Sequence, residues 1–299
     1  MSWHLGDAGD PAELVAAFLS DNGLPVRNLV RTVTQAHPIG SGSLCGAALY
    51  VSAAAGSVMA GGPSGPPSPV PSVPDVYAVI YRHTGGAGPV HRRPAKPWWL
   101  ADWRESRTAG QHATTPWWLA DWRESWTAGQ HATAVFAVRE AIARGDVYQV
   151  NVVGHASAPY LGDPLPALHR VAALPGARYG GVLAGDGWAL ATASPETLVE
   201  VRGGRVITRP IKGTRPATAA GRRELLASAK ERAEHVMIVD LERNDLARLA
   251  GVGPVRVDEL FAVRRWCGLW QAESVVSAPL TGVVGLADLL RAVCPGGSV

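Results

Sequence analysis

The sequence predicts an α+β fold whose strands pair mostly antiparallel. The first observation is a series of short β-branched and apolar runs between Tyr179 and Thr208, separated by glycine-containing turns such as Gly203-Gly204. Strands joined by such short turns pair antiparallel and do not fit a parallel βαβ scheme. The second observation is a long, charged, amphipathic stretch from Ala219 to Leu249, which is typical of a helix that covers one face of a sheet.

Composition indicates a soluble globular protein. The 299 residues are 47% hydrophobic and only 18% charged, so a substantial core can form. The net charge of +3 is small and the Lys and Arg residues are dispersed, which argues against a nucleic-acid-binding surface. We expect no membrane span, because no apolar run is long enough, and no signal peptide, because the amino terminus has no basic leader.

The cysteines point to a reducing compartment. Cys45, Cys267 and Cys294 lack the spacing of metal ligands, and an odd number cannot pair completely. We interpret them as reduced thiols of a cytoplasmic protein.

Residues 1–96 form the first expected region, an N-terminal α+β region. Asp10-Pro11 is typical of a helix start, because aspartate caps helices and proline suits the first turn, and this helix is expected to reach Leu19. Residues 61–74 are rich in Gly, Pro and Ser, which predicts a surface loop or linker. On either side of that loop lie two apolar segments expected to be strands, Leu44–Val58 and Val76–Tyr81.

Residues 97–133 hold a Trp-rich tandem duplication. The segment Pro97–Ser106 returns as Pro116–Ser125, and both copies end in the same Thr-Ala-Gly-Gln-His-Ala-Thr sequence. Two copies are too few for a solenoid, which needs about three repeats to bury a continuous core. The tryptophans could stack on bases or sugars, but the flanking charge is balanced rather than basic, so we interpret the block as a local duplication.

Residues 134–299 form the third expected region, which is regular in pattern. Gly145 is a natural C-cap for the helix before it, and Pro175-Gly176 stops another helix. The expected helices are Ala134–Arg144, Leu165–Leu174, Ala219–Leu249 with a break near Asn244, and Gly285–Val293; the expected strands are Asp146–Val153, Tyr179–Leu183, Trp188–Ala193, Thr197–Val201 and Arg205–Thr208.

Five motifs of this third region occur in a recognisable order. They are Gly145–Asn151, Ala193–Glu196, Arg209–Pro216, Ala233–Leu241 with Arg243-Asn244-Asp245, and Pro295–Val299. In this order they resemble the chorismate-utilising enzymes, and most closely component I of aminodeoxychorismate synthase, the para-aminobenzoate synthase of folate synthesis. One such motif alone would be a weak signal, but five in order make chance similarity very unlikely. The resemblance implies helices over large antiparallel sheets, with the catalytic site between them.

The resemblance implies two catalytic residues. Lys212 resembles the lysine that distinguishes aminodeoxychorismate synthases, whose neutral amine attacks ring carbon C2 of chorismate while the C4 hydroxyl leaves. The cations Arg209 and Arg215 flank this lysine and favour the neutral amine. Glu196 resembles the general acid that protonates the departing C4 oxygen, a role that needs a proton held in a buried or negatively charged setting.

The resemblance also implies a magnesium site. Glu234 resembles the family's magnesium-binding carboxylate, and Glu231 lies one helical turn before it. Residues at i and i+3 share a helix face, so both carboxylates can address one hydrated Mg²⁺. Magnesium takes only one or two protein carboxylates and keeps several waters, so the carboxylate of the substrate can complete its shell.

Five residues are implied to bind substrate. Gly213 permits close approach of the backbone, and the hydroxyl of Thr214 can hydrogen-bond the substrate. Relatives that add water to chorismate carry a lysine at the position of Gln149, so glutamine disfavours a water nucleophile. The full set is Gln149, Arg209, Gly213, Thr214 and Gln271.

Two departures from the family pattern affect the expected activity. Gln271 stands where the family has the histidine of a His-Leu-Val-Ser motif, and in relatives that eliminate pyruvate that histidine assists the lyase step. The chain also stops at Val299, where the family continues with Thr-Gly-Ala-Pro-Lys and then further magnesium carboxylates. Half of the expected cation site is therefore absent, and we expect this truncated polypeptide by itself to bind magnesium and chorismate weakly or not at all, and to be weakly active or inactive alone.

Three functions remain open from the sequence. The first is amination of chorismate to 4-amino-4-deoxychorismate, with ammonia supplied by a glutaminase partner (a glutamine amidotransferase subunit). The second is another chorismate enzyme, chiefly anthranilate synthase component I, which would release anthranilate and pyruvate. The third is a non-catalytic fragment or binding subunit, which would show no turnover even with a glutaminase present.

Overall fold

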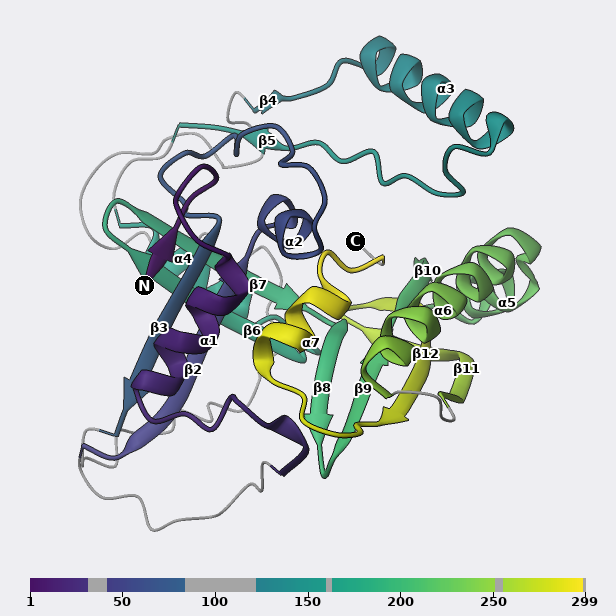
Figure 1. The fold of residues 1–299 in the computed structure, drawn as a ribbon. Helices are drawn as coiled ribbons and strands as arrows, with labels where there is room; N and C mark the ends of the chain where they lie inside the picture. The colour runs from purple at the N-terminus through teal and green to yellow at the C-terminus, as the bar shows by residue number, and fades with distance from the viewer. Residues whose placement is uncertain (32–41, 84–121, 160–162, 251–254, 298–299) are drawn as a thin grey trace. The chain divides into compact units, whose positions relative to one another are not determined.

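The computed structural model describes residues 1–31, 42–83, 122–159, 163–250 and 255–297 (Figure 1). The chain divides into two compact units, one formed by Met1–Arg92 with Leu165–Ser298 and the other by Arg93–Pro164 with Val299. Among the described residues no helix is both long and apolar enough to cross a membrane. The predicted region boundaries at residues 96 and 133 stay predictions.

The first unit begins with a three-stranded antiparallel sheet. Its order is β1 (Ser2–Trp3), β3 (Val76–Arg82), β2 (Leu44–Val51). Helix α1 (Pro11–Asp21) starts as predicted, because the Asp10 side chain accepts hydrogen bonds from the first turn. A short 3₁₀ helix follows at Leu29–Arg31.

The expected strand over Leu44–Val58 is wrong in its second half. The strand ends at Val51, and α2 (Ala53–Met59) begins with Ser52 as its cap. The physical reason is local: the serine oxygen accepts from Ala55 N, and the alanines that follow are good helix formers. Residues 61–74 contain no helix or strand, as their composition predicts.

The largest sheet of the first unit has five antiparallel strands. Its order is β8 (Thr197–Arg202), β9 (Arg205–Arg209), β12 (Leu269–Pro279) and β10 (Ile211–Pro216), with β11 (Arg256–Trp266) also paired to β12. Strand β12 therefore pairs with three others, and its residues from Ala272 to Ala278 are buried. The sequence predicts β8 and β9, but not the other three strands.

Along the chain, a β-hairpin separates the strands of the first sheet from those of the five-stranded sheet. It consists of β6 (Tyr179–Gly185) and β7 (Trp188–Ser194), and α4 (Leu165–Ala172) packs against both strands. The ring of Tyr77 meets that of Trp188 edge to face, with centroids 4.9 Å apart. This contact joins the hairpin to the first sheet.

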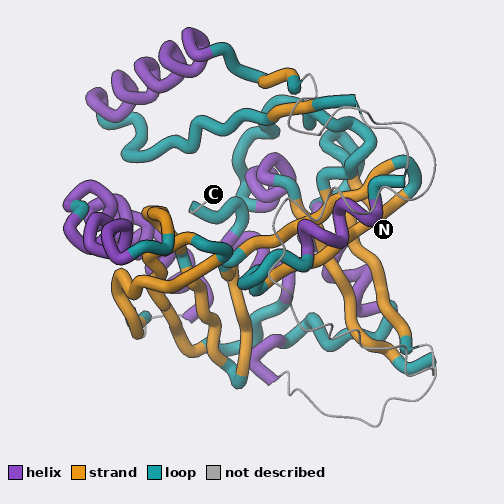
Figure 2. The backbone as a smooth tube through the Cα atoms, turned by 180° about the vertical axis from the view of Figure 1, so that it is seen from behind, coloured by secondary structure: helices purple, strands orange, loops and turns teal. Residues whose placement is uncertain are grey.

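Two helices cover the five-stranded sheet, and a third packs against one of them. They are α5 (Ala219–Ala227), α6 (Ala229–Ala250) and α7 (Leu286–Val293), and α6 contacts β10, β11, β12 and α7. Figure 2 shows α5 and α6 from behind, beside the strands they cover. The expected break near Asn244 is wrong: the helical stretch is interrupted at Ser228, whose extended backbone and hydroxyl begin α6.

One apolar core joins the amino-terminal and carboxyl-terminal parts of the first unit. Val15 of α1, Val76 of β3, Leu246 of α6 and Val293 of α7 are each at most 2% exposed and belong to the same cluster. An ion pair reinforces this joint, because Arg291 Nη2 lies 2.6 Å from Asp10 Oδ2. The predicted α+β class with antiparallel sheets is confirmed.

The second unit contains a helix and a small strand pair. Helix α3 (Ala128–Arg144) ends at Gly145 as predicted, but it begins earlier than expected, at a capping box between Thr127 and Gln130. Strands β4 (Arg123–Glu124) and β5 (Ala156–Ser157) pair antiparallel. Most of the Trp-rich duplication, including its first copy, lies outside the described residues.

The expected strand over Asp146–Val153 is wrong. None of these residues is in a strand, and Val150 and Val153 are 43% and 66% exposed. A β-branched run forms a strand only where a partner edge accepts its hydrogen bonds and a surface covers one of its faces.

Candidate active site

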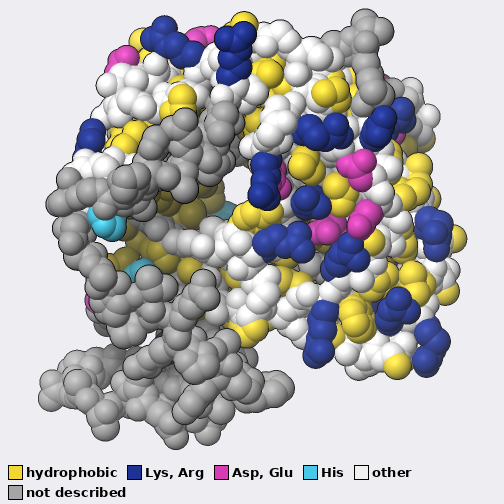
Figure 3. Space-filling view, turned by 90° about the horizontal axis from the view of Figure 1, so that it is seen from below, with side chains coloured by type: hydrophobic (Ala, Val, Ile, Leu, Met, Phe, Trp, Pro, Cys, Tyr) yellow, Lys and Arg dark blue, Asp and Glu magenta, His cyan; other side chains and the backbone are white. Residues whose placement is uncertain are grey.

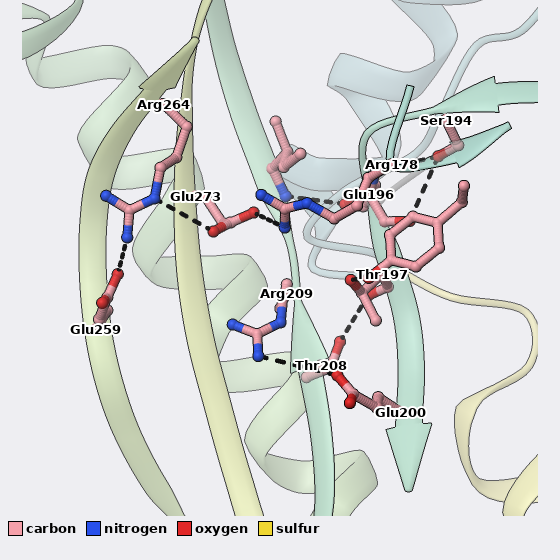
Figure 4. A network of polar contacts seen from close by, with 12 residues as sticks. Arg178, Ser194, Glu196, Thr197, Glu200, Thr208, Arg209, Glu259, Arg264 and Glu273 are labelled. Atoms are coloured by element: carbon pink, nitrogen blue, oxygen red, sulfur yellow. Dashed lines mark hydrogen bonds and ion pairs between the residues drawn. The ribbon is translucent and has the colours of Figure 1, made fainter. Parts of the chain in front are cut away.

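Glu196 is hydrogen-bonded to the backbone of the strand that carries Lys212. Glu196 lies in the turn between β7 and β8, and its Oε1 accepts the backbone N–H of Ile211 at 2.8 Å. Ile211 is the first residue of β10, and Lys212 is the second. The bond therefore fixes the carboxyl group beside the start of the strand that carries the amine (Figure 4).

The turn that carries Glu196 is itself ordered by Ser194. The backbone N–H of Glu196 donates to Ser194 Oγ at 3.1 Å, and this hydroxyl donates to the Glu196 carbonyl oxygen at 3.4 Å. Thr197 follows, nearly fully buried, and its hydroxyl is hydrogen-bonded to the phenol of Tyr179. Short polar residues thus hold the turn in place from both sides.

Gly213 marks an irregularity in β10. The register with β12 shifts between Lys212 and Thr214, and Gly213 has a φ of 77°. A Cβ atom at this position would lie 2.8 Å from Leu225 Cδ1 and 3.1 Å from Glu231 Oε2. Glycine is therefore required both by backbone conformation and by the close approach of α5 and α6.

Thr214 and Gln271 are neighbours on adjacent strands of the sheet. They are directly paired residues of β10 and β12, and Gln271 is also paired with Arg264 of β11. Thr214 is exposed, whereas Gln271 is half-buried. The two predicted substrate-binding residues therefore belong to one place on the sheet.

Glu231 and Glu234 lie on the first turns of α6, as expected. Glu231 is 9% exposed and pairs with Arg215 at 3.4 Å. The Lys230 amine lies 2.6 Å from Glu234 Oε2 and 3.7 Å from Glu231 Oε2, so one cation already contacts both carboxylates. No group of three potential metal ligands occurs among the described residues.

This arrangement is compatible with a hydrated magnesium ion. Magnesium needs only one or two protein carboxylates, and the Lys230 side chain that now contacts them is 74% exposed and free to turn into solvent. Arg215, expected to favour the neutral amine of Lys212, is instead turned to Glu231 and Glu224.

Arg209 lies at the end of β9 and its guanidinium faces Glu200 of β8 at 3.9 Å. Figure 4 shows a second set of ion pairs next to it, in which buried Glu273 lies between Arg178 and Arg264. Glu273 is 3% exposed, and its closest cation is Arg178 Nη1 at 2.9 Å. Two cations thus compensate for this buried charge.

Gln149, the remaining predicted substrate-binding residue, belongs to the second unit. Its side-chain nitrogen lies 3.4 Å from Asn151 Oδ1, and its side-chain oxygen is buried without a partner among the described residues. Its role in substrate binding stays a prediction.

His235 is a buried polar residue that the sequence analysis did not single out. It is 1% exposed, its Nε2 lies 2.6 Å from Ser274 Oγ, and its Nδ1 has no partner among the described residues. Burial, followed by the positive charge of Lys212, lowers the pKa of His235 to about 4. The imidazole is therefore neutral at physiological pH.

Glu242 is the second residue that the sequence analysis missed. It is 3% exposed, and burial raises its pKa to about 7, with further raising contributions from Asp245 and Glu196. It lines a cavity of about 160 Å³ together with Ser194, Glu196, Thr197, Leu198, Thr208 and Pro210. Lys212 does not line this cavity but acts on Glu242 electrostatically.

A signal for Glu242 was present in the sequence. The buried stripe of α6 includes Ile238, Leu246 and Leu249, and Glu242 occupies the position between the first two. A carboxyl group on the apolar stripe of an amphipathic helix is uncommon and marks a functional candidate. The sequence analysis missed Glu242 because it described the whole stretch only as an amphipathic helix.

Comparison with known proteins identifies the family. The family model described as chorismate binding enzyme matches residues 17–299. The chain belongs to the chorismate binding enzyme family. The family resemblance predicted from the five motifs is therefore confirmed.

Two curated relatives of this chorismate binding enzyme have different names. Aminodeoxychorismate synthase component 1 of Klebsiella aerogenes is 41% identical over 161 residues, which are 52% of this chain and 36% of that protein. Anthranilate synthase component 1 3 of Haloarcula marismortui is 36% identical over 168 residues, which are 54% of this chain and 33% of that protein. The matches thus span about a third of the length of these relatives.

The fold also matches a solved structure. Anthranilate synthase component I from Streptococcus pneumoniae TIGR4 superposes with a TM-score of 0.71 at 21% identity, covering 99% of this chain and 70% of that one. At this identity the match supports the fold rather than the reaction.

Proposed function

We propose that this chain carries the amination site of an aminodeoxychorismate synthase, which replaces the C4 hydroxyl of chorismate by ammonia. The observation that carries the proposal is the hydrogen bond from Ile211 to Glu196, which holds a carboxyl group beside the strand position of Lys212. The 41% identity to a relative named aminodeoxychorismate synthase component 1 adds support.

In the proposed reaction Lys212 is the nucleophile and Glu196 the general acid. The neutral amine forms a bond to C2 of the ring while the C4–O bond breaks, and Glu196 gives a proton to the departing oxygen, so that water leaves. Ammonia then bonds to C4 as the bond between C2 and the Lys212 nitrogen breaks, and the proton lost by the new C4 amine passes to the Lys212 nitrogen, which leaves as a neutral amine. One chorismate and one ammonia give one 4-amino-4-deoxychorismate and one water.

The remaining predicted residues bind or orient the substrate in this proposal. Glu231 and Glu234 would hold Mg²⁺, which supplies positive charge to the substrate carboxylate when bound. Gly213 lets the substrate approach the β10 backbone, while Thr214, Gln271, Arg209 and Gln149 offer polar contacts. A glutaminase partner would supply the ammonia.

A product assay tests this function. The 299-residue chain is incubated with chorismate, Mg²⁺ and an ammonium salt, with and without an added glutaminase and glutamine, and the products are separated by chromatography. We expect 4-amino-4-deoxychorismate. Without ammonia, mass spectrometry is expected to find a Lys212 adduct with the mass of chorismate minus one water, and absence of both results would contradict the proposal.

Anthranilate formation is the second candidate. It is favoured by the anthranilate synthase relative, which matches nearly the same length of chain at 36% identity. The same incubation distinguishes the two, because this reaction would release anthranilate and pyruvate and would not depend on the Lys212 amine.

A further inference from the structure

The carboxyl group of Glu242 is buried, and burial makes its charged form energetically unfavourable. It sits on the buried face of α6, between Ile238 and Leu246, in a helix that contacts β10 and β12. Taking a carboxyl group out of water destabilises its charged form unless polar groups or cations compensate. No ion pair reaches it among the described residues, unlike the case of Glu273.

The groups that face Glu242 come from four elements. Thr208 of β9 lines the same cavity and lowers the pKa of Glu242, while Glu196 from the turn before β8 raises that pKa electrostatically. Lys212 of β10 and Asp245 of α6 complete the set. Glu242 thus has one carboxyl group and one amine of the proposed reaction as electrostatic neighbours.

The two carboxyl groups of the cavity have different surroundings. Glu196 is half-buried and accepts a backbone N–H. Glu242 is buried deeper, where the protonated form is favoured. Two carboxyl groups that share one cavity tend to hold one proton between them.

From this geometry we propose that Glu242 is a proton-relay residue that supplies Glu196. The proton moves from the Glu242 carboxyl to the Glu196 carboxylate, and from Glu196 to the C4 oxygen as the C4–O bond breaks. The Lys212 nitrogen becomes positively charged when it bonds to C2, and the proton it then gives up restores the Glu242 carboxyl. Protons therefore balance within the three groups.

This inference rests on the proposed function, but its first test does not need turnover. Glutamate side chains of the chain are labelled with ¹³C at the carboxyl carbon, and their resonances are followed by NMR as pH is changed. We expect one resonance with a midpoint near the pKa of about 7 given above, and its absence in Glu242→Gln. In Glu196→Gln this midpoint is expected to fall, because the neighbouring negative charge is gone.

Asp240→Asn is the matched control for the titration. Asp240 lies on the same helix, is 67% exposed and pairs with Arg243. The variant is expected to leave the Glu242 midpoint unchanged. A Glu242 resonance with an ordinary midpoint, or one that Glu196→Gln does not move, would overturn the relay.

The second test is kinetic. In Glu242→Gln we expect kcat to fall roughly 10- to 100-fold with KM within about twofold, and the decline of kcat above neutral pH to disappear. Glu242→Asp is expected to recover part of kcat. If amination requires Lys212 but Glu242→Gln keeps the wild-type kcat and pH profile, only the relay is wrong; if Lys212→Ala retains full amination, the proposed function itself is wrong.

Discussion

The two sheets of the first unit differ in what they bury. The three-stranded sheet and its helices bury one charged side chain, Asp75, while every other buried polar or charged side chain among the described residues lies between Thr197 and Ser277. Asp75 has both oxygens in structural bonds, to Leu5 N at 3.0 Å and to Ser52 Oγ at 2.8 Å. The first sheet therefore uses its buried charge to fix a loop and a helix start.

The five-stranded sheet buries polar groups whose bonding is incomplete. His235 Nδ1 has no partner among the described residues, and Glu242 is buried without an ion pair. Such groups lower stability and persist where they serve binding or catalysis. The first sheet also buries one polar atom without a partner among the described residues, Trp3 Nε1, but its only buried charge is fully bonded, and the residues of the proposed chemistry belong to the second sheet and its helices.

The distribution of surface charge does not distinguish the three-stranded sheet from the five-stranded one. On the face drawn in Figure 3, Lys and Arg side chains are spread widely, with Asp and Glu side chains among those near its centre. Burial, rather than surface charge, separates the two sheets.

The largest effect is expected from Lys212→Ala. Removing the nucleophile should lower the rate of amination by roughly three orders of magnitude or more, with little change in thermal stability. The matched control is Arg82→Ala, which removes a cation from β3 of the first sheet. Equal losses in both variants would break the comparison, since the first sheet would then take part in the chemistry.

Glu242→Gln tests whether the buried carboxyl group of the second sheet makes stability depend on pH. The folded-state pKa is raised from 4.5 to about 7, so the folded protein holds more protons than the unfolded chain in this window, and the free energy of unfolding falls as pH rises through it. Above neutral pH the buried, ionised Glu242 side chain lowers the free energy of unfolding by about 3 kcal/mol. Urea titrations at several pH values should therefore show that the free energy of unfolding of the variant rises relative to that of the wild type between pH 4.5 and about 7.

Gly213→Ala tests the close packing behind the predicted lysine. The φ of 77° and the 2.8 Å approach of Leu225 are expected to cost about 1–3 kcal/mol in the free energy of unfolding, measured by urea denaturation. Gly181→Ala on β6 is the control, because no atom lies within 4 Å of its added Cβ. A neutral result at Gly213 would mean that the irregularity in β10 is not fixed by this contact.

Asp75→Asn gives the smallest expected effect. Weakening its two hydrogen bonds should cost about 1–2 kcal/mol of stability, seen as a lower melting temperature. Where the variant remains folded, kcat and its pH profile should match the wild type. A changed pH profile would show that the first sheet communicates with the site.

Elements with local signals were predictable from sequence. Asp10-Pro11 set the start of α1, Gly145 the end of α3, and Gly285 the start of α7, because caps and glycine conformations depend on a few neighbouring residues. The amphipathic pattern and the short turns also indicated the α+β class. These features need no knowledge of distant contacts.

Strands β10, β11 and β12 were not predictable in this way. Strand β10 reads Ile-Lys-Gly-Thr-Arg-Pro, which has a poor strand composition, and it forms because β12 offers a partner edge. Asp146–Val153 is the opposite case, with strand composition but no strand. Pairing across long sequence separations decides both outcomes.

The candidate site was predicted in part for the same reason. The motifs gave Glu196, Lys212, Gly213, Glu231 and Glu234, and the contacts bring Glu196, Gly213 and Glu231 to the β10 region. His235 and Glu242 depend on which face of α6 is buried, and that face is set by packing against β10 and β12. Their roles stay proposals.

The joint between Arg291 and Asp10 has a consequence for synthesis on the ribosome. Helix α1 emerges early, yet its cap and its apolar side, including Val15 and Leu19, meet α7 only after residue 291 has been added. Asp10 and Arg291 are 281 positions apart, so α7 cannot cover this side of α1 until all of the intervening residues have been added, and its apolar side chains are exposed to aggregation until then.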